Sequence, residues 1–373
     1  MKERLLNLDA IRGLAITGIL FVNIISFGWP ELYDSNPSSY WTTPLEQYIH
    51  EILRIFIQSN FYPVFAMLFG ISLTFVFKSA EKRGYNPYYI FSRRLFFLLV
   101  IGAAHAFLIW YGDILLVYAV LGFLLLLFYR LKPKNILIAA ASIWTIPNLL
   151  YGFLLKLNKT ELPTINNTDL IRLIINNYQS NFFNGFIQNI IDWSQLYTVS
   201  NIPFVIISIF PMFLFGLYFA KSQWITKISL HQYTNLRVYV LFTSGILGFT
   251  LKSLPMLNPN SFISHHFSEA FGGPLIGLFY VLLVLVLMRK TEINMTYFSN
   301  LGRMSMTNYL LQSIIGFILF KFFGLYGLIA PIKAISLGFG ILIIQSIFSY
   351  FWLKKYSYGP VNVFGGSILI QTG

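Results

Sequence analysis

The chain has 373 residues, of which 56% are hydrophobic and only 10% are charged. Soluble domains carry about 25% charged residues, so this composition excludes an ordinary soluble protein and indicates a chain that lies mostly in lipid. Cysteine is absent, which excludes disulfides, thiolate metal sites and cysteine nucleophiles.

About ten stretches are long and apolar enough to cross a bilayer as helices. They are predicted at residues 11–29, 52–77, 94–110, 114–128, 136–155, 204–219, 238–251, 275–288, 306–323 and 328–351. The second carries Asn60 and Pro63, so a short surface helix followed by a true span is the alternative there. Residues 111–113 alone separate the third span from the fourth, which predicts a tight re-entry. We therefore expect an all-α polytopic bundle forming one transmembrane domain over residues 1–373.

The distribution of lysine and arginine predicts the orientation of these helices. With the N-terminus placed inside, basic residues recur at every internal loop, which favours an even number of spans and two cytoplasmic termini. The net charge of +13 then reflects topology and contact with anionic lipid headgroups. The lipid bilayer is the expected partner, nucleic acid is not, and the oligomeric state is left open.

Two long segments fall on the outer side in this topology. Residues 30–51 are rich in Trp, Tyr and Pro, and residues 156–200 contain amphipathic stretches. The second is longer than a simple connection requires. Both are expected to lie on the outer surface or to roof a cavity as lids, with plain connection as the alternative.

Polar groups inside the predicted spans are the candidates for function, because ionisable groups are costly in a bilayer. The first helix carries Asp9, Arg12 and Asn23 on one stripe, which predicts a polar face lining a cavity. An Asp9–Arg12 ion pair that anchors the helix is the structural alternative.

The third helix carries Arg94 and His105, which share a face because they are 11 residues apart. Asp113 follows at the same end and is placed to orient or charge His105. The pair His105 and Asp113 is therefore the candidate catalytic group, with His105 as general base. A histidine that only donates a structural hydrogen bond is the alternative.

Arg93 and Arg94 begin the third helix and form a basic patch with Lys78, Lys82 and Arg83. Such a patch suits a phosphorylated cytoplasmic donor such as coenzyme A. Ordinary topology-setting charge is the alternative, and composition alone favours it.

The ninth predicted span opens with Ser305, Asn308 and Gln312 on one face. They are predicted to hold helices together through hydrogen bonds, or to line a cavity for a polar substrate. The outer loop that precedes the eighth span contains four polar residues that are expected to be solvated: Lys252, His265, His266 and Glu269. No P-loop, GxGxxG, HExxH or GxSxG pattern occurs, and no metal site is expected.

The chain resembles the bacterial YeiB family, built around domain of unknown function 418. The resemblance covers nearly the whole chain and is carried by RLLNLDAIRGLAITGILFVNI, FYPVFAMLFGIS, SRRLFFLLVIGAAHAFLIWYGDILLVYAVLG, PMFLFGLYFAK, GRMSMTNYLLQS and YSYGP. The ending departs from the family, because GPVNVFGGSI stands where a GPLEWLWR-like segment is usual. The resemblance implies a multi-pass protein of the bacterial cell membrane.

The family is in turn similar to transmembrane acyltransferases in its LDxxRG start, its arginine-bearing third helix and its membrane histidine. That similarity implies transfer of an acyl group from a cytoplasmic acyl-CoA to a small-molecule, lipid or glycan acceptor at the outer face. Acyl-CoA would be a donor substrate, and no tightly bound cofactor is expected. The alternatives are a transporter of a small amphiphile and a membrane protein without chemistry of its own.

Overall fold

The computed structural model describes residues 2–34, 39–159, 168–223, 234–290 and 295–361. Within them the chain is helical and contains no strand, as the sequence predicts. The helices are α1 Lys2–Gly28, α2 Pro44–Phe56, α3 Phe61–Lys82, α4 Pro87–Leu108, α5 Leu115–Phe128, α6 Pro133–Leu157, α7 Thr168–Ser180, α8 Phe182–Leu196, α9 Ile202–Lys221, α11 Thr234–Leu257, α12 Phe262–Phe267, α13 Gly273–Lys290, α14 Thr296–Arg303, α15 Ser305–Gly316 and α16 Pro331–Lys355. Shorter turns are η1 Glu31–Tyr33 and the π-helical η3 Ser268–Gly272 and η4 Phe317–Phe322.

Eight helical segments in the described chain are long and apolar enough to cross a membrane. They coincide with eight of the predicted spans, and α5 and α15 with η4 match the other two. The predicted span 52–77 is interrupted at residues 57–60, where α2 ends and α3 begins. The alternative that the sequence left open, a separate helix before the true span, is the one adopted.

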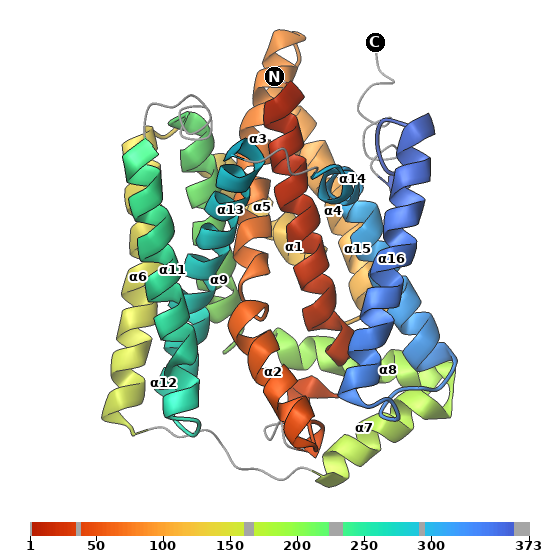
Figure 1. The fold of residues 1–373 in the computed structure, drawn as a ribbon. Coiled ribbons are helices and arrows are strands. Elements are labelled where there is room, and N and C mark those ends of the chain that lie inside the picture. The colour runs from red at the N-terminus through yellow and green to blue at the C-terminus, as the bar shows by residue number, and fades with distance from the viewer. Residues whose placement is uncertain (1, 35–38, 160–167, 224–233, 291–294, 362–373) are drawn as a thin grey trace.

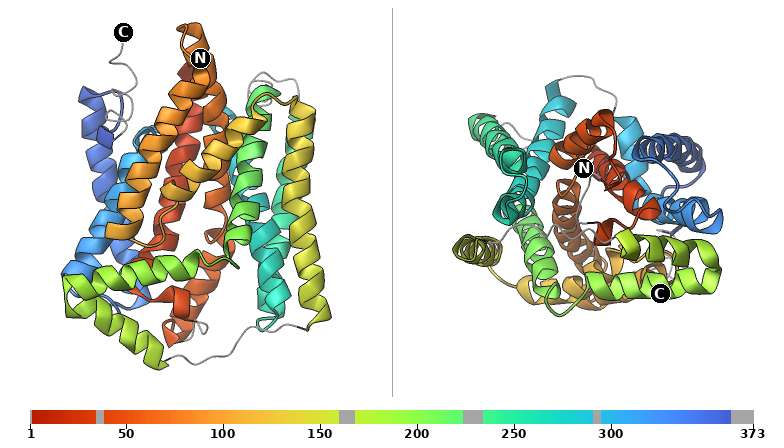
Figure 2. Two further views of the ribbon diagram at one scale, coloured as in Figure 1. Left: turned by 180° about the vertical axis from the view of Figure 1, so that it is seen from behind. Right: turned by 90° about the horizontal axis from the view of Figure 1, so that it is seen from below.

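The bundle has two distinct ends (Figure 1). The end at the top of Figure 1 is called the near end, and the opposite one the far end. At the near end α1 begins, α3 ends and α4 begins, and the last described residues of the chain also lie there. At the far end α1 ends, and α7 and α8 lie across the bundle rather than along it (Figure 2). The divergent ending beyond residue 361 lies outside the described residues.

The far-end layer comes from the segments predicted to lie on the outer surface. Helix α7 is amphipathic and buries Ile171, Ile174 and Tyr178, which recur on one face. Within these two segments, residues 35–38 and 160–167 lie outside the described residues. Amphipathic helices at this position favour an interfacial layer over the bundle; whether the layer moves as a lid stays a prediction.

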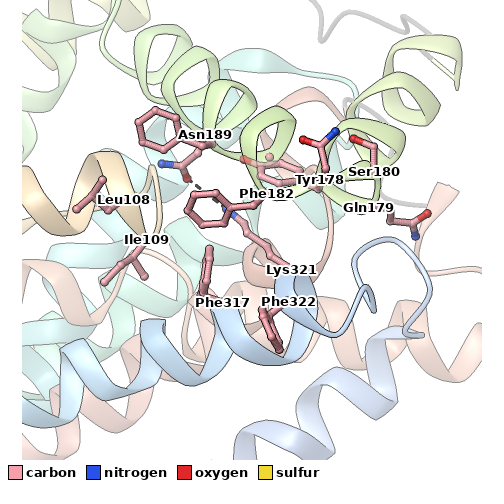
Figure 3. A pocket seen from close by; sticks show the side chains of 13 residues that line it. Leu108, Ile109, Tyr178, Gln179, Ser180, Phe182, Asn189, Phe317, Lys321 and Phe322 are labelled. Carbon is pink, nitrogen blue, oxygen red and sulfur yellow. Dashed lines mark hydrogen bonds between the residues drawn. The ribbon is translucent and has the colours of Figure 1, made fainter.

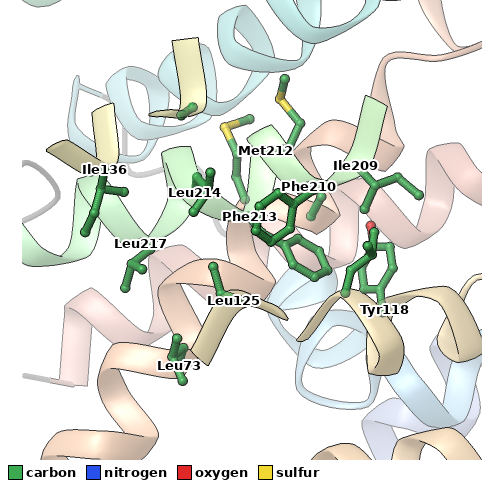
Figure 4. Packing of buried hydrophobic residues seen from close by; sticks show 14 of the residues in the cluster. Leu73, Tyr118, Leu125, Ile136, Ile209, Phe210, Met212, Phe213, Leu214 and Leu217 are labelled. Carbon is green, nitrogen blue, oxygen red and sulfur yellow. The ribbon is translucent and has the colours of Figure 1, made fainter. Parts of the chain in front are cut away.

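A large apolar cluster holds α3, α4, α5, α6 and α9 together. Leu125, Phe213, Leu214 and Leu217 are fully buried in it, with Tyr118 beside them (Figure 4). This packing fixes α4 against α5 and so supports the candidate site at their junction. Close dispersion contacts of this kind are the main source of helix association in lipid.

Two glycines of the sequence motifs make the contact between α1 and α14. A Cβ on Gly13 would lie 1.9 Å from the carbonyl oxygen of Phe298, and one on Gly302 would lie 1.8 Å from that of Asp9. The two backbones therefore touch at a distance that only glycine permits. The contact brings the end of α14, with Arg303, against the turn of α1 that carries Asp9 and Arg12.

Candidate functional site

The His105–Asp113 pair lies at the far end, where α4 turns back into α5. The Nδ1 atom of His105 is 2.7 Å from Oδ1 of Asp113, and both side chains are buried. The second carboxylate oxygen, Oδ2, accepts from the backbone N–H of Leu116 at 2.7 Å. One carboxylate therefore orients the imidazole and caps the first turn of α5 at once.

The local sequence explains why these two side chains meet. Helix α4 ends after Leu108, and the N–H groups of Ile109 and Trp110 both bond the His105 carbonyl at 3.0 Å. A Cβ on Gly102 would lie 2.4 Å from the backbone nitrogen of Leu116, so Gly102 allows the start of α5 to close on α4. The resulting tight hairpin returns Asp113 to the imidazole of His105.

Helix α8 packs against this hairpin and forms hydrogen bonds with its backbone. Asn189 donates to the carbonyl of Ala106 at 2.8 Å and accepts from the backbone N–H of Tyr111 at 2.9 Å. The hydroxyl of Tyr197 donates to the backbone carbonyl of Asp113 at 3.0 Å. The α7–α8 layer thus restrains the peptide groups on both sides of the pair.

The other imidazole nitrogen of His105 is unsatisfied. Among the described residues, its buried Nε2 has no hydrogen-bond partner. The ring packs against Tyr309 of α15, with 5.3 Å between ring centroids. Oδ1 of Asp113 is placed to accept a hydrogen bond from an Nδ1–H of His105, which favours the tautomer with a proton on Nδ1 and a lone pair on Nε2. A buried nitrogen left in this state is suited to take up a proton.

The predicted basic residues gather at the near end instead. Arg12 bonds Asp9 at 2.8 Å, so the predicted ion pair forms. Arg94 is near enough to Arg12 for their charges to repel, and the charge of Arg303 acts on the Asp9 carboxylate. Two arginines, Arg12 of α1 and Arg303 of α14, thus act on the Asp9 carboxylate, and Arg94 of α4 lies near the first of them. Arg93, the preceding residue of α4, places its guanidinium 5.6 Å from the ring centroid of Tyr89.

The predicted polar face of α15 joins helices. Asn308 donates to Ser349 of α16 at 3.2 Å, and Gln312 donates to Gln345 of α16 at 3.1 Å. These bonds correspond to the first of the two readings, helix association. Buried oxygens of Asn308 and Gln312 nevertheless have no donor within the described part of the chain, and a cavity-lining role stays a prediction. Ser305, at the start of α15, is half-buried.

The structure therefore brings together some predicted residues and separates others. His105 meets Asp113, and Arg94 approaches the Asp9–Arg12 pair. His105 and Arg94 remain about 16 Å apart along α4, since they are separated by three helical turns. Asn23 is half-buried in the far half of α1, and its backbone carbonyl accepts a hydrogen bond from the Ser26 hydroxyl at 3.1 Å.

A second polar cluster, centred on Asp192 of α8, was missed by sequence reasoning. Its carboxylate is buried and accepts from Tyr33 at 2.9 Å, from Tyr178 at 2.5 Å and from Gln188 at 2.7 Å. Burial raises the pKa of Asp192, and these three donors with the charge of Lys321 oppose the rise. The one available signal was the spacing of Gln188 and Asp192 by four residues on an amphipathic helix.

The expectation for Lys252 is wrong. Predicted to be solvated in a loop, it is only 1% exposed, because α11 continues to Leu257 and carries it into the bundle. Its ammonium donates to the carbonyl of Gln58 at 2.8 Å. Because this backbone carbonyl receives the ammonium, the helix carries the single charge past the point where the predicted span ended. His265 and His266 are half-buried and bond the carbonyls of Pro259 and Asn148 at 2.9 and 3.0 Å.

Comparison with known proteins gives a family but no activity. The family described as protein of unknown function (DUF418) matches residues 219–364. Similar relatives are the uncharacterized protein YxaH of Bacillus subtilis, 32% identical over 96% of this chain and 92% of its own length, and the uncharacterized protein YeiB of Escherichia coli, 26% identical over 96% and 94%. An uncharacterized 39.9 kDa protein from the amylase 3' region of Bacillus acidopullulyticus is 26% identical over 97% and 92%. No solved structure matches the chain significantly. The chain belongs to the DUF418 family, and it is similar to YeiB over nearly the full length of both proteins.

Proposed function

We propose that this DUF418 protein is a membrane-embedded acyltransferase, which moves an acyl group from a cytoplasmic acyl-CoA to an acceptor at the outer face of a bacterial cell membrane. One observation carries the proposal. His105 is buried, held at Nδ1 by Asp113, and left without a hydrogen-bond partner at Nε2 among the described residues. A positioned base of this kind is what acyl transfer to a hydroxyl or amine requires.

The residues of the pair then have separate roles. Nε2 of His105 takes the proton of the acceptor hydroxyl or amine. At the same time the oxygen or nitrogen of the acceptor attacks the thioester carbonyl carbon. The carbon–sulfur bond breaks, coenzyme A leaves as a thiolate, and the imidazolium returns the proton to that sulfur. Asp113 holds the ring and stabilises the imidazolium, as a carboxylate does in other acid–base pairs. Protons and electrons balance without a further reactant.

The near-end arginines supply the donor site in this proposal. Arg94, Arg12 and Arg303 present fixed positive charge, and guanidinium groups recognise phosphate through paired donors. The separation of about 16 Å along α4 between Arg94 and His105 suits an extended pantetheine arm. Arg93 would assist from the rim. The thioester would then reach the imidazole while the phosphates stay at the near end.

The absence of cysteine makes a direct assay possible. Purified protein in detergent would receive acetyl-CoA or decanoyl-CoA together with a bacterial lipid and glycan extract, and free thiol would be followed with Ellman's reagent. The chain contributes no thiol background, because it has no cysteine. Wild type should release coenzyme A and label an acceptor, and H105A should lose at least about 100-fold in rate. H265A is the matched control, a histidine bonded to the Pro259 carbonyl, and should keep full activity.

Two results would contradict the proposal as stated. Equal thiol release by wild type and by a folded H105A protein would remove His105 from the chemistry. Movement of a labelled amphiphile across proteoliposomes, unchanged and without acyl product, would instead establish the transporter alternative.

A further inference from the structure

A pocket of about 280 Å³ opens at the far end, between α4, the α7–α8 turn, α8 and η4 (Figure 3). Lys321 of η4 points into it, beside Asn189 and Tyr178. The pocket is distinct from the His105–Asp113 pair, neither of which lines it. It combines one cation with a wall that is more apolar than polar, and these two features decide what it can hold.

The Lys321 ammonium has neutral partners. It donates to Oδ1 of Asn189 at 3.2 Å and lies 4.1 Å from the ring centroid of Tyr178. Among the residues that the structure describes, no carboxylate comes within 4.0 Å of it to form an ion pair. Asp192 is the nearby counter-charge, but its oxygens are engaged by Tyr33, Tyr178 and Gln188 and it does not line the pocket. An ammonium has three donors, so Lys321 retains capacity for an anion.

Part of the pocket wall is apolar and exposed at the surface of the bundle. Leu108 of α4 is 56% exposed, and Phe182 of α8 and Phe322 of η4 are each 73% exposed, all apolar and all lining the pocket. Such side chains at the end of a membrane bundle are solvated by acyl chains. A soluble anion would leave this wall without a function, whereas an amphiphile would cover it.

We propose that the pocket binds a phospholipid with a net negative headgroup, whose phosphate contacts Lys321 and whose acyl chain lies along Leu108 and Phe322. Electrostatic attraction between a basic pocket and anionic lipid, added to buried apolar area, is the general basis of such sites. The proposal does not depend on acyl transfer and stands or falls separately from it.

The test compares lipid retention by native mass spectrometry. Protein in neutral detergent would be titrated with phosphatidylglycerol, which is anionic, and with phosphatidylcholine of the same chains, which is not. Wild type should prefer phosphatidylglycerol by about fivefold or more, and K321Q should lose that preference. K333Q, at an exposed lysine that does not line the pocket, is the matched control and should behave as wild type.

A second variant fills the pocket without touching the charge. Gly185 lines the pocket, and a Cβ placed there would meet no atom closer than 3.5 Å, so G185L has room at its first carbon. G185L should also lose retained phosphatidylglycerol, with an unchanged melting temperature, and it carries the test alone should K321Q fail to fold. Wild-type preference in both folded variants would overturn the proposal. Displacement of phosphatidylglycerol by millimolar inorganic phosphate would overturn it too, because the site would then be one for free phosphate.

Discussion

Asp113 restrains His105 through Nδ1 alone, at 2.7 Å, while Nε2 of the same ring stays buried without a partner among the described residues. A histidine used only to hold helices together would be expected to satisfy both nitrogens, since a buried unpaired polar atom costs about 1–3 kcal/mol. The cost is explained if Nε2 forms a hydrogen bond with a bound acceptor, as the proposed general-base role requires.

Replacing Asp113 tests whether it positions His105. Its two oxygens accept from His105 and from Leu116, and an amide offers only one acceptor. D113N should lower kcat of acyl transfer by about 10²- to 10⁴-fold, with little change in KM for acyl-CoA. The measurement is the steady-state split of kcat and KM together with the pH profile of kcat, which a merely structural role would not change. A rise in KM at constant kcat would contradict the assignment.

The near-end arginines are expected to act on donor binding. R94Q should raise KM for acyl-CoA by about tenfold or more and leave kcat nearly unchanged, because the phosphates lie far from the reacting carbonyl. R172Q, at a far-end arginine whose side chain is 74% exposed, is the control. Titration calorimetry with coenzyme A alone gives an independent reading. If R94Q binds coenzyme A with unaltered affinity, the donor must bind elsewhere.

The contact between α1 and α14 should fail when either glycine acquires a side chain. In G13V or G302V the added carbon would meet backbone that cannot move aside, which should cost about 1–3 kcal/mol or more. The melting temperature of the protein in detergent reports the loss. G340A is the matched control, since nothing lies within 4 Å of a Cβ there, and it should melt no lower than wild type. A tolerated G302V would show that the two helices can separate.

Burial of Asp192 predicts a pH dependence of stability. Its pKa is raised above the ordinary value of 3.8, so the folded state holds the proton more tightly than the unfolded state. Stability contributed by Asp192 is therefore present at low pH and declines as pH rises above 3.8 through the raised value. The melting temperature of wild type relative to D192N should fall over that interval. D169N, at a fully exposed carboxyl on α7, should leave the pH dependence as it is, and a relative gain for wild type with rising pH would refute the prediction.

The sequence was sufficient where the signal is local. Asp113 follows His105 by eight residues across one tight turn, and Asp9 and Arg12 are neighbours on one helix. Periodicity and apolar length place the spans because a bilayer demands both. In each case the distance along the chain limits the distance in space.

The rest depends on contacts that no local pattern encodes. Tyr33 and Asp192 are 159 residues apart, and Lys321 and Asn189 are 132 apart. Lys252 was assigned to a loop because its charge ends an apolar run, yet the helix passes it and buries it. Hydropathy reports the composition of a helix, but it does not predict which distant residue will form a hydrogen bond with a polar group within that helix.

The most direct test of the proposed chemistry is a structure of the protein with a nonhydrolysable acyl-CoA analogue. We predict the phosphates beside Arg94 and the thioester-equivalent carbonyl next to the His105 imidazole, with room for an acceptor atom at about 3–3.5 Å from that carbonyl. An analogue whose acyl end points away from His105, or one that does not enter between the helices at all, would contradict the assignment of His105 as the base.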